Sequence, residues 1–217
     1  MKKIKKEVWL TSFVCLLPIL AGLYFYPQLP ETVATHFGID GTPNGYSSRF
    51  TAAFALPALL LVLHLVCCVG GSRGLARGTE SAATRRVILW ICPFISVLCS
   101  SVTLGTALGG EMHITTLVPS AVGVLFLVMG NYMPKIRPNH TIGVRTPWTY
   151  TSEENWRYTH RITGFVWVIA GILMLIISLL RLWQNWMTAV LLLLAAGVPI
   201  GASYLHYCRY ERGNEHE

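Results

Sequence analysis

Long apolar runs separated by short charged segments dominate this chain. Six stretches contain no Asp, Glu, Lys or Arg, and each is 19 to 27 residues long. A helix of about 20 apolar residues crosses a hydrocarbon core of about 30 Å. Trimmed to their apolar parts, the stretches predict six membrane helices, over residues 8–26, 51–69, 87–107, 114–133, 162–180 and 186–207. We therefore expect an all-α integral membrane protein with six transmembrane helices.

The composition supports this fold class over a soluble globule. Of the 217 residues 53% are hydrophobic and only 12% are charged, against roughly 25% charged in an average soluble domain. The first apolar run follows a lysine-rich start and therefore imitates a signal peptide. It is longer than the apolar region of a secretory signal, about 7–15 residues, so we expect it to be a retained helix.

The net charge of +7 reports mainly on topology. If the N-terminus lies in the cytoplasm, 15 of the 17 basic residues fall on the cytoplasmic side, and only Arg49 and Arg181 fall outside. Cytoplasmic loops of membrane proteins carry such a Lys/Arg excess. We expect both termini in the cytoplasm and no direct binding of nucleic acid.

The loops divide the chain into three predicted parts. Residues 1–70 form a transmembrane helix pair joined by a structured outward loop over 27–50, and residues 71–86 form a cytoplasmic linker. Residues 87–217 form a four-helix membrane region with a cytoplasmic loop over 130–161.

The predicted spans carry few groups suited to chemistry. His64 is the one ionisable side chain well inside a span, and it is either a proton relay or metal ligand or, as we favour, a hydrogen-bonding contact to another helix. Gly105-x-x-x-Gly109 and Gly197-x-x-x-Gly201 favour helix packing. The six cysteines form no metal or disulfide pattern. No catalytic motif is present, so we expect neither an enzyme nor a bound metal or cofactor.

Turn-forming residues indicate that the outward loop is a folded lid. Gly38, Gly41 and Gly45 alternate with Asp, Pro and Asn, which are typical of tight turns. His36, Phe37 and Tyr46 give this lid an aromatic face. Such a face suits either anchoring in the membrane interface or recognition of something that arrives from outside.

The cytoplasmic loop carries a second concentration of special residues. Pro134, Pro138 and Pro147 exclude a continuous helix. Thr151 and Glu154 match a capping box, so a helix should begin there and run into the fifth span. The aromatic residues of this loop suit the lipid headgroup layer, as an anchor, although a partner site is the alternative: Trp148, Tyr150, Trp156 and Tyr158.

The two loops together resemble the SdpI-like family of bacterial membrane proteins over nearly the whole chain. The first motif comprises Leu29-Pro30, Thr35-His36-Phe37-Gly38 and Gly41-x-Pro43-Asn44-Gly45-Tyr46. The second comprises Gly130-Asn131-Tyr132-Met133-Pro134-Lys135, Ile142-Gly143-x-Arg145-Thr146-Pro147-Trp148-Thr149 and Ser152-x-Glu154-x-Trp156-x-x-Thr159-His160-x-x-x-Gly164.

The resemblance implies an immunity protein in the bacterial cytoplasmic membrane that protects its cell from a secreted, membrane-active peptide toxin. It also implies a second role, in which the toxin-loaded protein holds a small DNA-binding autorepressor at the membrane. The partners expected are therefore lipid, toxin and repressor.

We assign a hypothetical role to each loop. The residues expected to face the toxin are His36, Phe37, Gly41, Asn44 and Tyr46. The residues expected to form the cytoplasmic partner patch are Asn131, Pro134, Arg145, Pro147, Trp148, Glu154, Trp156 and His160.

Two other functions are compatible with the sequence. The first is a small permease or channel for an ion or amphipathic solute, with His64 and the Ser/Thr-rich third span lining its path. The second is an intramembrane enzyme that uses His36 or His113, for which the sequence offers no carboxylate or metal partner.

Overall fold

The computed structural model describes residues 2–38, 40–76, 81–139, 142–182 and 185–210. Within them, six helical segments are long and apolar enough to cross a membrane: Lys6–Gln28, Thr51–Gly70, Thr84–Ala107, Ile114–Lys135, Glu153–Leu179 and Trp186–Tyr210. The six-helix, multi-pass membrane fold expected from the sequence is thereby confirmed. The chain forms two compact units, Met1–Arg73 with Arg86–Leu117 and Gly74–Arg85 with Val118–Glu217.

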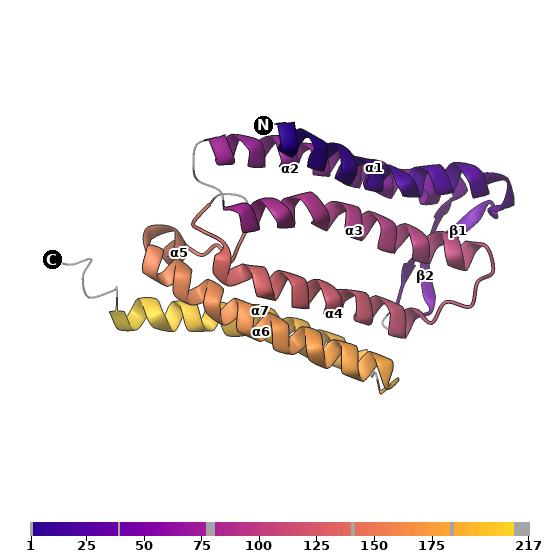
Figure 1. The fold of residues 1–217 in the computed structure, drawn as a ribbon. Coiled ribbons are helices and arrows are strands. Elements are labelled where there is room, and N and C mark those ends of the chain that lie inside the picture. The colour runs from indigo at the N-terminus through magenta and orange to yellow at the C-terminus, as the bar shows by residue number, and fades with distance from the viewer. Residues whose placement is uncertain (1, 39, 77–80, 140–141, 183–184, 211–217) are drawn as a thin grey trace. The chain divides into compact units, whose positions relative to one another are not determined.

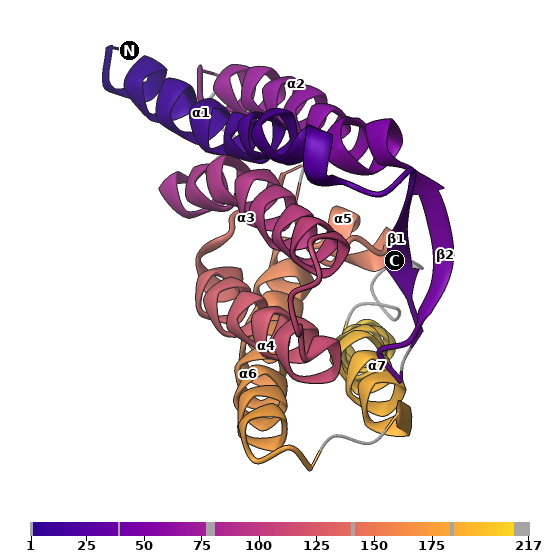
Figure 2. The same cartoon turned by 90° about the vertical axis from the view of Figure 1, so that its right-hand side faces the viewer.

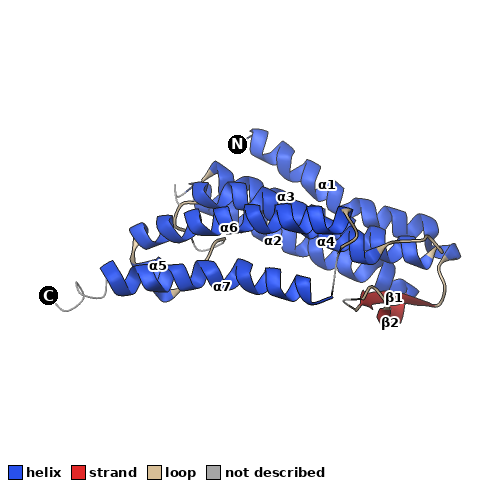
Figure 3. Ribbon diagram, turned by 90° about the horizontal axis from the view of Figure 1, so that it is seen from below, coloured by secondary structure: helices blue, strands red, loops and turns tan. Residues whose placement is uncertain are grey.

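The first unit combines three helices with a β-hairpin. Helix α1 (Lys2–Phe25) ends in a 3-10 turn, η1 (Tyr26–Gln28), and leads into strands β1 (Thr32–Phe37) and β2 (Pro43–Ser48). A π-helical turn, η2 (Thr51–Ala55), opens α2 (Leu56–Ala76), and α3 (Ala82–Ala107) follows. Figure 1 shows the hairpin at the end of α1 opposite the N-terminus. The sequence predicted a folded loop here, and the structure adds that it consists of two antiparallel strands, the red elements in Figure 3.

Polar side chains join α1 and α2 inside this unit. Thr11 Oγ1 lies 2.9 Å from the carbonyl oxygen of Glu7 and 3.0 Å from His64 Nε2. Since the hydroxyl has one hydrogen and a carbonyl only accepts, His64 Nε2–H donates to Thr11. Both side chains are fully buried. The interpretation of His64 as a helix contact is confirmed.

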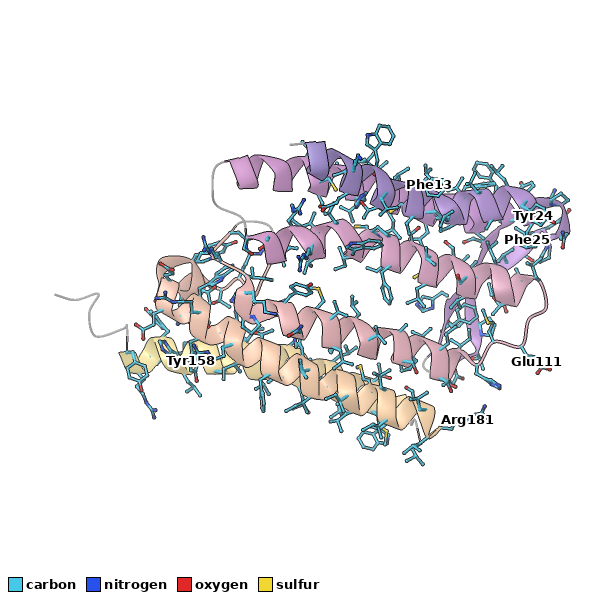
Figure 4. All side chains as sticks on the ribbon, in the orientation of Figure 1. Phe13, Tyr24, Phe25, Glu111, Tyr158 and Arg181 are labelled. Atoms are coloured by element: carbon cyan, nitrogen blue, oxygen red, sulfur yellow. The ribbon has the colours of Figure 1, made fainter. Side chains whose placement is uncertain are left out.

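The outer surface of α1 is apolar, as a lipid-facing helix requires. Phe13 and Tyr24 project away from the helix in Figure 4 and are 53% and 74% exposed. Their exposure contrasts with the buried Thr11 on the same helix. The unit is therefore apolar outside and partly polar inside, which is expected where the solvent is lipid.

The hairpin end of the first unit has its own small core. Leu29, Ala53 and Leu104 are buried together, and Ala21 and Tyr26 pack against them. Arg49 lies over the Tyr26 ring, with its guanidinium carbon 5.0 Å from the ring centroid. The segment that leads into β1 is therefore fastened to α1, η2 and α3.

The secondary-structure elements described in the second unit are all helices. Helix α4 (Ile114–Tyr132), whose first turn belongs to the first unit, ends in the 3-10 turn η3 (Met133–Lys135). A short helix, α5 (Pro147–Thr151), precedes the long helices α6 (Glu153–Leu179) and α7 (Asn185–Tyr210). In Figure 2 α4 lies beside α6.

Glycines let α4 and α6 approach backbone to backbone. A Cβ at Gly123 would lie 3.0 Å from the carbonyl oxygen of Gly171, and one at Gly130 would lie 2.9 Å from that of Gly164. Small residues of this kind permit close helix packing in membranes. The two pairs share one antiparallel register, seven residues apart on each helix.

The two glycine motifs highlighted in the sequence do not act this way, and that prediction was wrong. A Cβ at Gly109, Gly197 or Gly201 meets no described atom within 4 Å, and Gly105 meets the side chain of Met112. Spacing alone does not show which helix face is turned toward a neighbour.

Candidate functional site

The hairpin in the first unit is held by a compact turn. The backbone N–H of Gly38 donates to the Thr42 carbonyl at 2.8 Å, and that of Gly41 donates to the Gly38 carbonyl at 2.9 Å. Gly41 has φ of 79°, a conformation that favours glycine. A Cβ at Gly41 would also meet Thr115 at the start of α4. These contacts join the described residues of the turn, 38 and 40–42, to one another and to the start of α4.

A carboxylate stabilises this turn from within. Asp40 accepts hydrogen bonds from the Thr42 hydroxyl at 2.7 Å and from the Thr42 backbone N–H at 3.1 Å. These bonds stabilise the ionised form and lower the pKa of Asp40 below its ordinary value. The turn consequently keeps a negative charge at neutral pH.

The side chains expected to face the toxin lie together on this hairpin. His36 Nδ1 and Asn44 Oδ1 form a hydrogen bond at 2.5 Å between the strands. Gly45 pairs with His36, and a Cβ there would clash with the histidine. Tyr46 is 64% exposed and Phe37 is half-buried. These four residues of the hairpin are called here the hairpin surface: His36, Phe37, Asn44 and Tyr46.

In the second unit, Trp156 and His160 of α6 form a buried stacked pair. Their ring centroids are 4.1 Å apart with an interplanar angle of 17°. Trp156 Nε1 donates to the carbonyl oxygen of Ile136 at 2.9 Å, which ties the segment after η3 to α6. Neither side chain is more than 1% exposed. The prediction that Trp156 anchors in the headgroup layer is wrong, because its ring is enclosed by protein.

Both ring nitrogens of His160 are occupied. Nδ1 lies 2.8 Å from the Trp156 carbonyl oxygen, and the backbone N–H of Val144 donates to Nε2 at 3.2 Å. Because the carbonyl only accepts and the amide only donates, the neutral ring must carry its proton on Nδ1. His160 therefore positions the loop and has no nitrogen left for proton transfer or a metal.

The loop beneath this pair is closed by side-chain bonds to the backbone. The Asn139 amide donates to the carbonyls of Arg137 and Ile142 and accepts the Ile142 N–H at 2.8 Å. Gly143 has φ of 135° and rests against the His160 ring, where a Cβ would clash. The described residues of this segment are irregular, as the prolines predicted, and these hydrogen bonds join them to one another.

Helix α5 is capped by a threonine pair. Thr146 Oγ1 accepts the Thr149 N–H, and Thr149 Oγ1 accepts the Thr146 N–H at 2.8 Å. Helix α6 is capped by Ser152, whose hydroxyl accepts the Asn155 N–H at 3.1 Å. The predicted cap, Thr151 with Glu154, is one residue too early, since Thr151 still belongs to α5.

A buried polar network connects α5, α6 and α7. Trp148 Nε1 donates to Ser203 Oγ at 2.7 Å, and Ser203 Oγ donates to Asn155 Oδ1 at 2.7 Å. Thr159 donates to the same amide oxygen at 2.9 Å. The Trp148 ring stacks on Tyr207 at 5.9 Å between centroids. The cytoplasmic end of α7 predicted from the sequence is thereby joined to α5.

Comparison with known proteins matches both regions. Residues 135–203 match the model of the SdpI/YfhL protein family, and residues 13–61 match a domain of unknown function, DUF1648. The immunity protein SdpI of Bacillus subtilis strain 168 is 26% identical over 208 residues, which cover 94% of this chain and 96% of that protein. Residues 135–203 are thus similar to the SdpI/YfhL family. No solved structure matches it.

The segment that matches the SdpI/YfhL family model begins and ends at residues that can be located in the structure. It begins at Lys135 in η3 and ends at Ser203, the residue that receives the Trp148 hydrogen bond. It therefore contains the Trp156–His160 pair and the polar network. The second match, over residues 13–61, contains the whole hairpin.

The structure separates the eight residues of the predicted partner patch into two groups. Trp156 and His160 are buried and Trp148 is half-buried, so these three shape the loop from within. The other five are exposed, on α4, η3, the loop before α5, α5 itself and the start of α6, and are called here the signature patch: Asn131, Pro134, Arg145, Pro147 and Glu154.

The sequence reasoning missed Asn155, Thr163 and Ser203, three buried polar residues of this SdpI/YfhL region. Each is a polar residue within or beside an apolar span, which is a signal that could have indicated burial. Among the described residues no group of three His, Cys, Asp or Glu side chains could hold a metal ion.

Proposed function

We propose that this protein protects its cell from a secreted, membrane-active peptide toxin and that it does so in the bacterial cytoplasmic membrane. The observation that carries the proposal is the 26% identity to the immunity protein SdpI over 94% of the chain. That alignment is long enough to include both the hairpin and the SdpI/YfhL region. A toxin that acts on membranes must be met at the membrane, where a six-helix protein is placed.

In this proposal the two surfaces have different tasks. The hairpin surface meets the arriving toxin, and its ordered turn lowers the entropy cost of binding. The signature patch faces the cytoplasm and docks a small DNA-binding repressor. Its charged members, Arg145 and Glu154, offer both signs of charge to such a partner.

The proposal requires the hairpin to lie outside the cell. We predict that a reporter fused after Tyr46, of a kind active only outside the cytoplasm, will be active, because 15 of the 17 basic residues then lie inside. The same reporter fused after Arg86 serves as the control and should be silent. Activity of a cytoplasm-specific reporter after Tyr46 would contradict the orientation.

Survival of a toxin-sensitive strain that expresses this chain tests the function, with the toxin of the Bacillus subtilis relative's own system as challenge. We expect Tyr46→Ala to lower the tolerated toxin concentration about tenfold, since exposed aromatic residues often dominate binding. Tyr24→Ala is the matched control, because Tyr24 is exposed in the same unit outside the hairpin (Figure 4). Equal survival of the Tyr46 and Tyr24 variants would exclude Tyr46 from toxin contact.

A further inference from the structure

A groove of about 360 Å³ runs between α1 and α3 within the first unit. Ligand pockets in proteins begin at roughly 300 Å³, so the groove is large enough to receive part of a molecule. Its walls are apolar except for two hydroxyls. They include Leu17, Ala21 and Phe25 of α1, Ser100 and Ser101 of α3, and Leu108 just after α3. Leu17, Ser101 and Leu108 are exposed, so the groove can be reached from outside the unit.

One of these hydroxyls lacks a hydrogen-bond partner. Ser100 is 6% exposed, and its Oγ has no partner among the described residues. A buried hydroxyl without a partner is unfavourable, and a ligand that supplies a donor or acceptor would remove this cost. In the protein alone, the Ser100 hydroxyl in the groove has no hydrogen-bond partner among the described residues. An apolar ligand that carries one polar group would fit the walls and supply that partner.

The depth of Ser100 distinguishes between two classes of ligand. Ser100 lies seven residues before Ala107, the last residue of α3, which places it about 10 Å below the helix end at 1.5 Å per residue. The ester groups of a phospholipid stay in the interfacial layer near that end. Its acyl chains carry no hydrogen-bonding group at this depth. A transmembrane peptide can place a polar side chain there.

The floor of the groove also suits a peptide helix. Ser101 and Gly105 lie four residues apart on α3, and small residues at this spacing let a second helix approach closely. The atoms nearest to a Cβ at Gly105 belong to the flexible side chain of Met112. Methionine adapts its shape readily and can yield to a ligand.

The groove is also continuous with the base of the hairpin. Ala21 and Leu104 line it and pack in the same small core as Leu29, which leads into β1. The groove also includes Phe25, the last residue of α1, and Leu108, the residue after α3, so it extends toward the hairpin end of the unit.

We propose that the α1–α3 groove binds an apolar helical segment of the secreted peptide within the membrane, with a polar side chain of the peptide bonded to Ser100. This inference rests on the proposed function. The hairpin surface is then the entry point, and the groove is the site where the peptide is retained.

The test measures binding of the fluorescently labelled toxin peptide of the relative's own system to the full chain in lipid nanodiscs. Ser101→Leu fills the groove and is expected to weaken binding at least tenfold. Ser100→Ala removes only the hydroxyl and should weaken it about threefold, the effect of one hydrogen bond in a membrane. Gly70→Leu is the control, because a Cβ at Gly70 of α2 meets no described atom within 4 Å.

The outcomes separate this proposal from the proposed function. Unchanged binding of the peptide by both groove variants overturns the groove site, even if the wild-type chain protects cells. Lost binding in the groove variants supports it, even if cell survival is unaffected. If Ser101→Leu instead releases co-purified phospholipid and leaves peptide binding unchanged, the groove is a lipid site and the proposal is wrong. Should Ser101→Leu fail to fold, the conservative Ser100→Ala decides.

Discussion

Trp156→Ala is expected to destabilise the second unit by about 3–5 kcal/mol, the usual cost of deleting a buried large aromatic side chain. The ring is fully buried and stacked on His160, and its N–H holds the carbonyl of Ile136. Its removal would leave a cavity and an unpaired carbonyl at once. Unfolding of the purified protein in mixed micelles, followed by far-ultraviolet circular dichroism, measures the change.

Two further variants make this result specific. Trp186→Ala removes the same side chain from the start of α7, where it is 59% exposed, and should cost less than about 1 kcal/mol. Trp156→Phe keeps an aromatic ring in the site and should cost about 1–3 kcal/mol, because the buried Ile136 carbonyl loses its donor. If Trp156→Ala were as stable as Trp186→Ala, the assignment of Trp156 to the interior would be wrong.

Gly164→Leu is expected to prevent α4 and α6 from packing. A Cβ at this position would lie 2.7 Å from the Gly130 carbonyl oxygen and 2.8 Å from Pro134 Cδ. A backbone carbonyl and a proline ring cannot move aside as a flexible side chain can, so the cost exceeds the usual 1–3 kcal/mol of an overpacked core. We expect a several-fold drop in folded protein recovered from membranes, measured by fluorescence size-exclusion chromatography.

Gly197→Leu provides the matched control for this experiment. It places the same side chain on α7 of the same unit, at a glycine where a Cβ meets no described atom within 4 Å. Its recovery should equal that of the wild type. Equal recovery of both leucine variants would show that α4 and α6 do not meet through Gly130 and Gly164.

The gaps between charges predicted the membrane helices well for a physical reason. Lipid tolerates only long apolar segments with internally satisfied backbones, so each span must be visible in the sequence. The predicted span over 162–180, for example, ends one residue after α6, which runs from Glu153 to Leu179. The nine residues before the span were expected to be helical from the capping pattern, and only the capping residue was misplaced.

Features that depend on distant residues could not be predicted in this way. Ser203 and Asn155 are 48 residues apart, and no local pattern pairs them. The packing of Gly130 against Gly164 also could not be predicted, because neither glycine is part of a Gly-x-x-x-Gly motif. The hairpin was recognised as ordered because its turns are local, whereas its strands were missed because their pairing is irregular around His36.

The sequence also could not show which aromatic residues are buried. Trp148, Tyr150, Trp156 and Tyr158 all suit a membrane interface by type. Tyr150 is 50% exposed and Tyr158 39% exposed, while Trp156 is enclosed. Trp156 is enclosed because the loop before α5 bonds to α6 at this point, through the Ile136 carbonyl and the Val144 N–H. The types of the aromatic residues do not show this.

The membrane potential of toxin-treated cells is the most direct measure of protection against a membrane-active toxin. Sensitive cells that express this chain, with its level in the membrane verified, are exposed to the toxin of the relative's own system and followed with a potential-sensitive dye. We predict that the potential persists at toxin concentrations that abolish it in cells with empty vector. Collapse at the same rate in both would contradict an immunity function.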